Sequence, residues 1–213
     1  MLSSLLALAH PLLAPAFTAW GVPATWLEIA AFFLSLWMVG CEMRVHALAW
    51  PLAMLSSLLY ALLFADSKLY GEGSLQLFFV AMSVWGWWQW LRGRGADGGA
   101  LAIRRLAPGA AWRIAAVTAI CWPLAGFLLH RYTDSDVPYL DALPTVGSVV
   151  GTFLLGRKFI ENWPVWLAVN AFSVGLFAWK GLWLTVVLYA LFAGLSWAGW
   201  KAWKGLERRK LAT

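Results

Sequence analysis

Charged residues are scarce in this 213-residue chain. Lys, Arg, Asp and Glu make up 12% of it, whereas hydrophobic residues make up 62%. A soluble domain needs about a quarter of its residues charged to cover its surface. The deficit excludes an ordinary water-exposed surface and predicts a chain that is embedded in a lipid bilayer.

Cysteine and histidine are rare, with two and three copies. Cys41 and Cys121 lie in apolar runs without CxxC spacing, which predicts small, inert hydrophobic side chains. The histidines, His10, His46 and His130, lie near loops or termini and never in pairs on one helix face. G-x-S-x-G and H-E-x-x-H motifs are also missing. These absences argue against a membrane enzyme and predict no catalytic residue, metal site or cofactor.

The first 24 residues lack the basic n-region that a signal peptide needs. They are apolar and contain three prolines, and His10 carries their only ionisable side chain. We therefore expect residues 1–24 to be retained as an N-terminal interfacial segment, in the form of an interfacial or re-entrant helix.

Seven apolar stretches suit membrane-spanning helices of about 17–25 residues. They are expected at 25–42, 46–65, 70–91, 111–130, 139–157, 161–179 and 182–203.

The sequence also repeats itself, because residues 28–92 align with residues 141–205 without a gap. The alignment contains 14 identities in 65 positions, where composition alone gives roughly 5 or 6. Rare residue types coincide: Arg44 with Arg157, Trp50-Pro51 with Trp163-Pro164, and Gly86-Trp87 with Gly199-Trp200.

The repeat predicts two three-helix modules, residues 25–92 and 139–205, joined by a linker span at 111–130. Three crossings reverse the side on which the chain emerges, so the single linker crossing makes the two modules parallel. The predicted fold class is an all-α integral membrane protein with seven transmembrane helices in a 3+1+3 arrangement.

Lys and Arg gather in alternate connections, namely the 93–110 loop, the Arg157-Lys158 turn and the basic tail at 206–213. The other loops are acidic or poor in charge. This excess marks the cytoplasm, so the N-terminus is expected outside and the C-terminus inside. Orientation in the bilayer is a sufficient reason for the net charge of +6, so no nucleic-acid partner is expected.

Asn170 is the most informative polar residue because it lies close to mid-membrane, about nine residues into its span. A buried amide needs partners for two donors and one acceptor. Trp166 precedes it by four residues, so the indole and the amide share one helix face. The pair favours a planar, aromatic and even cationic solute. A structural hydrogen bond between helices stays open as the alternative.

Gln76 and its repeat mate Tyr189 place hydrogen-bonding groups at the same level of both modules. Thr145 and Ser148 are weaker candidates, because hydroxyls in membrane helices usually bond their own helix. Glu28 is the repeat mate of Asp141, near the outer ends of their spans. These two acids are expected either to line an outer vestibule or to pair with a neighbouring Lys or Arg.

The chain resembles the PnuC family of nicotinamide riboside transporters over residues 25–205. The resemblance is carried by Trp26-Leu27-Glu28, Leu75-Gln76, Gly86-Trp87, Arg157-Lys158, Glu161-Asn162-Trp163, Trp166, Asn170, Ser173, Phe177 and Tyr189.

The resemblance implies a SWEET-like carrier with parallel repeats that assembles as a homo-oligomer, a trimer, in the bacterial inner membrane. It implies inward facilitated diffusion of nicotinamide riboside by alternating access, with the product trapped by cytosolic phosphorylation. The expected substrate-binding residues are Gln76, Trp166, Asn170 and Tyr189, followed by Thr145 and Ser148. Thiamine and riboflavin, carried by relatives, remain alternative substrates, and a non-catalytic subunit of a larger transporter remains an alternative role.

Overall fold

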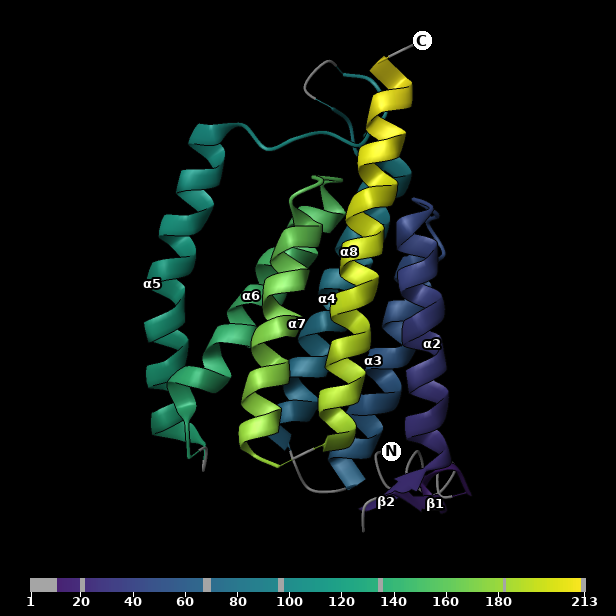
Figure 1. Cartoon of the computed structure of the whole chain (residues 1–213), viewed down its shortest axis with the longest axis vertical. Helices are drawn as coiled ribbons and strands as arrows, with labels where there is room; N and C mark the ends of the chain where they lie inside the picture. Colours follow the sequence, from purple (N-terminus) through teal and green to yellow (C-terminus); the bar gives the residue numbers. More distant parts are fainter. Residues whose placement is uncertain are drawn as a thin grey trace. The chain divides into compact units, whose positions relative to one another are not determined.

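The computed structural model describes residues 11–19, 22–66, 70–95, 98–133, 136–181 and 183–211. The chain divides into two compact units, Met1–Trp88 and Gln89–Thr213. Within the described residues it forms two short strands and seven helices of 18 residues or more (Figure 1). The all-helical character predicted for the membrane-embedded part is therefore confirmed.

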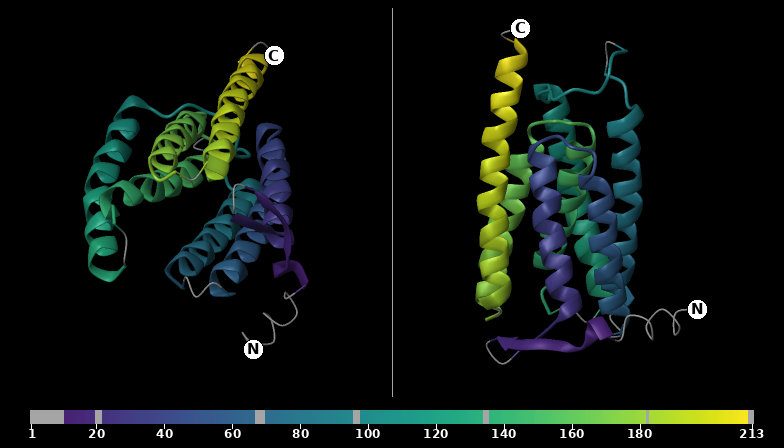
Figure 2. Two further views of the ribbon diagram at one scale, coloured as in Figure 1. Left: turned by 60° about the horizontal axis from the view of Figure 1, so that its bottom comes forward. Right: turned by 90° about the vertical axis from the view of Figure 1, so that its right-hand side faces the viewer.

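The segment directly before the first long helix is a hairpin, and residues 11–13 ahead of it are helical. Strand β1 (Pro15–Ala19) pairs antiparallel with β2 (Val22–Thr25), and Figure 2 shows the pair lying across the start of helix α2. The helix predicted within residues 1–24 is therefore wrong for the two strands, and residues 1–10 lie outside the described part. Prolines disfavour a helix interior, and the β-branched and aromatic residues between them favour strands. The position of this segment at the membrane surface stays a prediction.

Helix α2 (Trp26–Met43) begins with a capping box. The Thr25 hydroxyl accepts a hydrogen bond from the Glu28 N–H (3.2 Å), and the Glu28 carboxylate accepts one from the Thr25 N–H (2.7 Å). This arrangement satisfies two backbone donors at the helix start. The structure thus gives the Glu28 carboxylate a capping role, and the vestibule or ion-pair role expected for it stays a prediction.

In the first unit, α2 is followed by α3 (Ala49–Asp66) and by α4 (Tyr70–Arg92) as far as Trp88. The hydroxyls of Ser35 in α2 and Ser56 in α3 lie 3.1 Å apart, within hydrogen-bonding distance. The Trp50 indole of α3 lies directly over Gly86 of α4, where an added Cβ would overlap the ring. Close contact with glycine thus fixes how α3 approaches α4.

In the second unit, α5 (Pro108–Tyr132), α6 (Pro138–Gly156), α7 (Asn162–Trp179) and α8 (Trp183–Leu211) pack in chain order (Figure 1). The Trp163 indole of α7 lies over Gly199 of α8 as Trp50 lies over Gly86. Trp203 is fully buried and contacts the Trp163 ring edge-on, with centroids 5.7 Å apart.

Positions related by the sequence repeat share their local geometry. Val45 and Lys158, which are 113 residues apart, both adopt a positive φ, 56° and 55°. The residues before them cap α2 and α6 with nearly equal angles, φ −89° and ψ 3° against φ −90° and ψ 5°. Positive φ is uncommon outside glycine and costs energy in a β-branched residue such as Val45. Its recurrence shows that the two helix–turn–helix connections are built alike.

The helix bounds lie within three residues of the expected spans, except at the C-terminus of α8. Residues up to Leu211 continue that helix, so most of the tail predicted at 206–213 is helical. Four helices, α2, α3, α5 and α6, are long and apolar enough to cross a membrane. Crossings by α4, α7 and α8 stay predictions.

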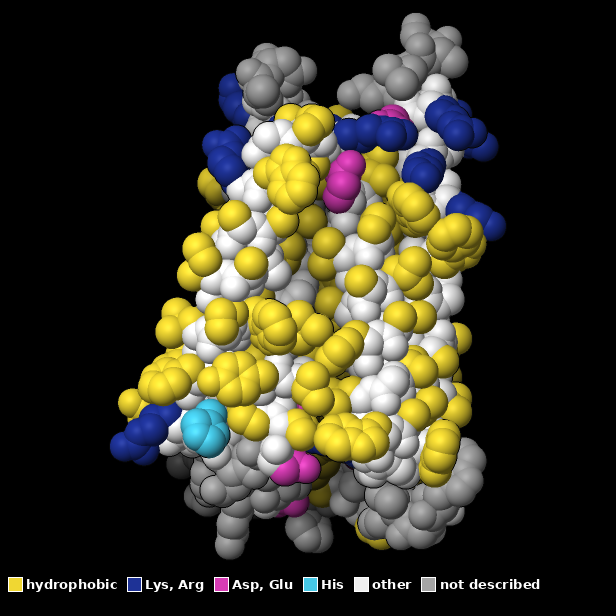
Figure 3. Space-filling view, turned by 60° about the vertical axis from the view of Figure 1, so that its left-hand side comes forward, with side chains coloured by type: hydrophobic (Ala, Val, Ile, Leu, Met, Phe, Trp, Pro, Cys, Tyr) yellow, Lys and Arg dark blue, Asp and Glu magenta, His cyan; other side chains and the backbone are white. Residues whose placement is uncertain are grey.

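The surface agrees with a lipid environment. On the face drawn in Figure 3, hydrophobic side chains cover the middle of the helices, and Lys and Arg gather mainly at one end. In α5, Trp112 is 78% exposed and Ile120 68% exposed. Large apolar side chains exposed to this degree fit contact with lipid or with another membrane protein.

The basic loop after α4 is bound to the rest of the second unit. The backbone of Arg104 pairs with that of Phe159 in an isolated parallel β-bridge. The Lys158 ammonium donates a hydrogen bond to the Leu101 carbonyl (3.0 Å). Farther along, Arg105 forms hydrogen bonds of 2.8–3.1 Å with the carboxylate of Glu207 on α8. The loop therefore connects α8 to the turn between α6 and α7.

We predict that Gly199→Ala lowers the thermal stability of the purified protein, because the new methyl group overlaps the Trp163 ring. Overpacking of this kind typically costs about 1–3 kcal/mol. Tryptophan fluorescence during heating in detergent measures the effect. Gly194→Ala in the same helix is the control, since nothing lies within 4 Å of its Cβ. Equal melting temperatures for the two variants would show that the indole–glycine contact contributes nothing to stability.

Candidate solute-binding site

A polar stripe runs along one face of α7. Trp166, Asn170, Ser173 and Phe177 follow one another at spacings of four, three and four residues, which places them on one side of a helix. Asn170 is 6% exposed and Ser173 is 1% exposed. Apart from Asn162 at its first position, the rest of α7 is apolar, so these two buried polar side chains mark the face on which a ligand could bind.

Asn170 makes a hydrogen bond across the contact between α7 and α8. Its amide Nδ2 donates to the Ser196 hydroxyl (3.2 Å), and that hydroxyl donates to the Phe192 carbonyl (2.8 Å). The structure therefore contains a hydrogen bond between helices, as expected if Asn170 has a structural role. An amide has two N–H donors and a carbonyl acceptor, and the Ser196 bond engages only one donor.

Trp166 contacts a different neighbour. A Cβ added to Gly151 of α6 would lie 2.9 Å from Cε2 of the Trp166 indole, so the ring lies against that glycine. The indole and the Asn170 amide share α7, as predicted, but the ring contacts α6 whereas the amide contacts α8.

Tyr189 lies on α8, seven residues before Ser196. Its ring stacks on Phe177 of α7, with centroids 5.1 Å apart and planes inclined by 27°. Seven residues are two helical turns, or about 10 Å along the axis. Asn170, Ser196 and Tyr189 therefore belong to one contact between α7 and α8.

Sequence reasoning missed Ser196 and gave Ser173 no role. Ser196 aligns with an identical residue, Ser83, in the first repeat, and both are 4% exposed. That coincidence was an available signal. The buried Ser173 hydroxyl has no hydrogen-bond partner within the described part of the chain. Its spacing from Asn170 was the available signal there.

The two weaker candidates, Thr145 and Ser148, lie on α6. The Thr145 hydroxyl donates to the Asp141 carbonyl (3.0 Å), and its side chain lines an apolar cavity of about 340 Å³ between α5 and α6. Ser148 is half-buried in α6, and its carbonyl accepts from Thr152 (2.8 Å). The structure does not bring Thr145 to the α7–α8 contact. Gln76 is half-buried in α4 and belongs to the first unit.

Asp141, near the start of α6, forms an ion pair with Lys180, whose ammonium lies 3.4 Å from its carboxylate. The same ammonium lies 3.7 Å from the Asp136 carboxylate. Of the two roles expected for Asp141, the pairing with a neighbouring Lys is the one that the structure contains.

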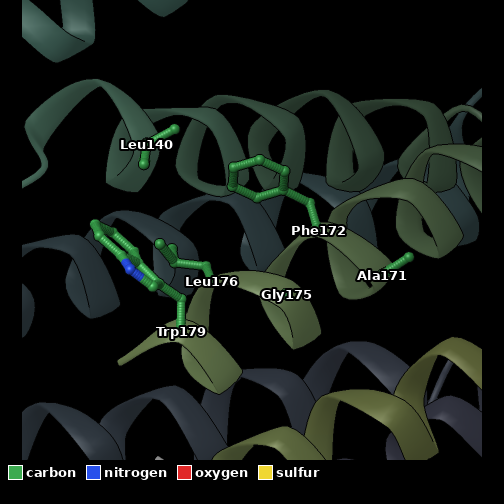
Figure 4. Close-up of a pocket in the computed structure, with 6 residues that line it drawn as sticks. All are labelled: Leu140, Ala171, Phe172, Gly175, Leu176 and Trp179. Carbon is green, nitrogen blue, oxygen red and sulfur yellow. The ribbon is translucent and has the colours of Figure 1, made fainter. Parts of the chain in front are cut away.

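A second hollow, of about 320 Å³, lies between α6 and α7. Figure 4 shows its lining, with Leu140, Phe172 and Trp179 among the surrounding side chains. Ligand sites for polar solutes combine an apolar wall with a few converging polar groups. Both hollows are apolar, and neither includes Asn170 or Ser196. Among the described residues, no three His, Cys, Asp or Glu side chains are grouped to hold a metal ion.

Comparison with known proteins identifies similar transporters. Residues 25–205 match the family described as nicotinamide mononucleotide transporter. The chain is 24% identical to the nicotinamide riboside transporter PnuC of Escherichia coli (strain K12) over 216 residues, 90% of each protein. It is 27% identical to the riboflavin/roseoflavin transporter RibM of Streptomyces davaonensis over 187 residues, 86% of this chain and 87% of that protein.

The fold is also similar to a known one. The crystal structure of the vitamin B3 transporter PnuC superimposes with a TM-score of 0.70 at 23% sequence identity, covering 86% of this chain and 83% of the other. The resemblance drawn from the sequence is confirmed, and so is the expectation of a transporter instead of an enzyme. Because the family pattern covers most of its length, the chain belongs to the nicotinamide mononucleotide transporter family of membrane proteins.

Proposed function

We propose that this protein imports nicotinamide riboside by facilitated diffusion, with the Asn170 amide contacting the solute. The observation that carries the proposal is the Asn170–Ser196 pair, a buried polar group at mid-helix in a family of transporters. Buried polar groups in membrane helices most often serve a substrate pathway or a helix contact.

The proposed architecture is seven transmembrane helices in a 3+1+3 arrangement, with α5 linking two parallel, SWEET-like repeats. The matching turns at Val45 and Lys158 support it, as do the four apolar helices α2, α3, α5 and α6. Parallel repeats that rock against each other would give alternating access. The outside N-terminus, the cytoplasmic C-terminus, the inner-membrane location and the trimer remain predictions.

The chemistry of nicotinamide riboside suits the α7–α8 contact. Its carboxamide has the same donors and acceptor as the Asn170 side chain, so the two groups can pair. Its pyridinium ring is flat and cationic, which favours the face of an aromatic ring such as Tyr189 in this contact, or Trp166, whose ring lies against α6. Ser173 offers a further hydroxyl for the ribose.

A riboside fits better than the mononucleotide after which the family is named. A phosphate monoester carries about −1.5 to −2 charges at neutral pH. Helices α2, α3, α6 and α7 contain no Lys or Arg, and α4 and α8 contain none before Arg92 and Lys201. A phosphate at mid-membrane would therefore lack a cationic partner, and an unpaired buried charge is very costly.

The positions of the acids support a carrier without proton coupling. Up to Lys201, every Asp and Glu of the six repeat helices lies within one turn of a helix end. Glu42, which is only 8% exposed, lies at the next-to-last position of α2. A carboxylate in a proton relay ordinarily lies deeper in the membrane. Net uptake would then depend on phosphorylation of the product in the cytosol.

Riboflavin is the second candidate substrate, because the riboflavin/roseoflavin transporter matches at 27% identity. Its isoalloxazine ring is also flat and carries hydrogen-bonding groups, so the α7–α8 contact does not distinguish it by shape alone. Thiamine is a third heterocycle of the same kind.

We predict that the purified chain alone, reconstituted in liposomes, takes up nicotinamide riboside to equilibrium and no further, without a proton gradient. Binding titrations with nicotinamide riboside, its mononucleotide, riboflavin and thiamine measure selectivity. We expect the riboside to bind at least tenfold more tightly than the mononucleotide, a difference of about 1.4 kcal/mol. If only riboflavin binds, riboflavin replaces nicotinamide riboside as the proposed substrate. If the chain transports none of the four solutes, a role as a subunit of a larger transporter is indicated.

We predict that Asn170→Leu weakens riboside binding by about 10–100-fold, because the carboxamide of the solute loses its partner. Calorimetric titration measures the loss, and thermal unfolding confirms that the variant is folded. Ser196→Ala is the matched control. It removes the interhelical bond but keeps the amide, so binding should change by less than about fivefold. Normal binding by Asn170→Leu would reduce Asn170 to a structural contact between helices.

A further inference from the structure

Two lysines near the C-terminal end of α8 are held over indole rings. The Lys201 ammonium lies 5.1 Å from the centroid of the Trp197 ring, and the Lys204 ammonium lies 3.6 Å from that of Trp200. The two indoles contact each other edge-on, with centroids 5.3 Å apart. We call these four residues the α8 cluster. Cation–π contacts of this kind position the ammonium groups without neutralising their charge.

The α8 cluster lies where the helix would leave the bilayer. Helix α8 begins at Trp183, and about 20 residues at 1.5 Å each span the roughly 30 Å hydrocarbon layer. Lys201 and Lys204 are therefore level with lipid headgroups, on the side where Lys and Arg are in excess.

An exposed apolar stripe leads to the cluster. Val187 is 59% exposed, Leu191 42% and Trp197 45%. Gly194 lies between the last two, with open space where its Cβ would be. These four residues follow one another at spacings of four, three and three, which places them along one side of α8. The exposed Lys201 lies on the same side, four residues after Trp197. The stripe can hold a hydrocarbon chain whose headgroup reaches the lysines.

The lysines are not required by the repeated architecture. The repeat mates of Trp197, Trp200, Lys201 and Lys204 are Val84, Trp87, Trp88 and Leu91. Trp88 and Leu91 are 54% and 59% exposed, so the same helix face in the first repeat is apolar. The two repeats share their packing but differ in this charge, which indicates a role particular to α8.

The charge of α8 is also largely uncompensated. Glu207 is its only acidic residue, and both of its carboxylate oxygens accept hydrogen bonds from Arg105. Those bonds lower the pKa of the Glu207 carboxyl, so it stays ionised and paired at neutral pH. Arg208, which is exposed, lies seven residues after Lys201 on the same side of the helix. Lys201, Lys204 and Arg208 thus present a row of cations.

We propose that the α8 cluster binds the phosphate headgroup of an anionic phospholipid, with an acyl chain along Val187, Leu191 and Gly194. Positive side chains attract the anionic lipids of the cytoplasmic leaflet, and indoles favour the headgroup level. The exposed apolar stripe distinguishes a lipid from free phosphate. The lipid site is separate from the Asn170–Ser196 pair, so this proposal does not depend on which solute the protein carries.

The test is native mass spectrometry of the full chain in detergent, titrated with dioleoylphosphatidylglycerol or with dioleoylphosphatidylcholine. We expect the anionic lipid to bind at least tenfold more tightly than the zwitterionic one. Lys201→Gln combined with Lys204→Gln should weaken phosphatidylglycerol binding about tenfold. The control, Arg92→Gln combined with Arg113→Gln, removes two exposed cations elsewhere and should change binding less than twofold.

Two further arms test the acyl chain. Gly194→Leu fills the stripe without changing charge and should weaken phosphatidylglycerol binding, whereas millimolar inorganic phosphate should not displace the lipid. Thermal unfolding verifies that each variant is folded. Equal binding of both lipids, equal losses in the two charge variants, unchanged binding by Gly194→Leu, or displacement by inorganic phosphate would each overturn the proposal.

Discussion

The interior of a bilayer contains no water, so a polar group placed there without a partner in the protein is costly. This constraint explains the structure at each level. Helices satisfy the backbone, and the Thr145 hydroxyl bonds the carbonyl four residues before it. Ser35 lies within hydrogen-bonding distance of Ser56 on the next helix. Because so few polar side chains are tolerated, the bond between Asn170 and Ser196 stands out as the place where a polar solute could be exchanged for an internal partner.

Packing has to replace the hydrophobic effect between helices that are surrounded by lipid. The same contact occurs in each repeat. A Trp indole at the start of one helix lies over a glycine of the next helix: Trp50 of α3 on Gly86 of α4, and Trp163 of α7 on Gly199 of α8. These contacts are common to both repeats, and so is the buried serine, Ser83 or Ser196, whereas Asn170 and the lysines of α8 are not. Asn170 aligns with Ser57, and the two lysines of the α8 cluster align with Trp88 and Leu91. The shared residues build the scaffold, and the differences between the repeats are where we assign binding.

The sequence predicted the helices well because apolar run length, proline and charged ends determine a membrane helix. It failed where local chemistry competes with composition. Thr25-x-x-Glu28 is a capping-box pattern, yet Glu28 was expected either to line a vestibule or to pair with a Lys or Arg. Recognising that pattern would have predicted the helix start and its cap. The β1–β2 hairpin was hidden by its apolar composition. For the site, the burial of Asn170 followed from its depth. Its partner Ser196 did not, because the rotation of one helix against another depends on packing that no single helix contains.

Labelling of single cysteines with an impermeant maleimide tests the central claim, that the two three-helix repeats are parallel. Asp66 and Trp179 are repeat mates, both exposed, at the last positions of α3 and α7. In a background with Cys41→Ala and Cys121→Ala, Asp66→Cys and Trp179→Cys should both react in intact cells. Arg208→Cys should react only after permeabilisation. Reaction of the first two positions from opposite sides of the membrane would show inverted repeats and contradict the account.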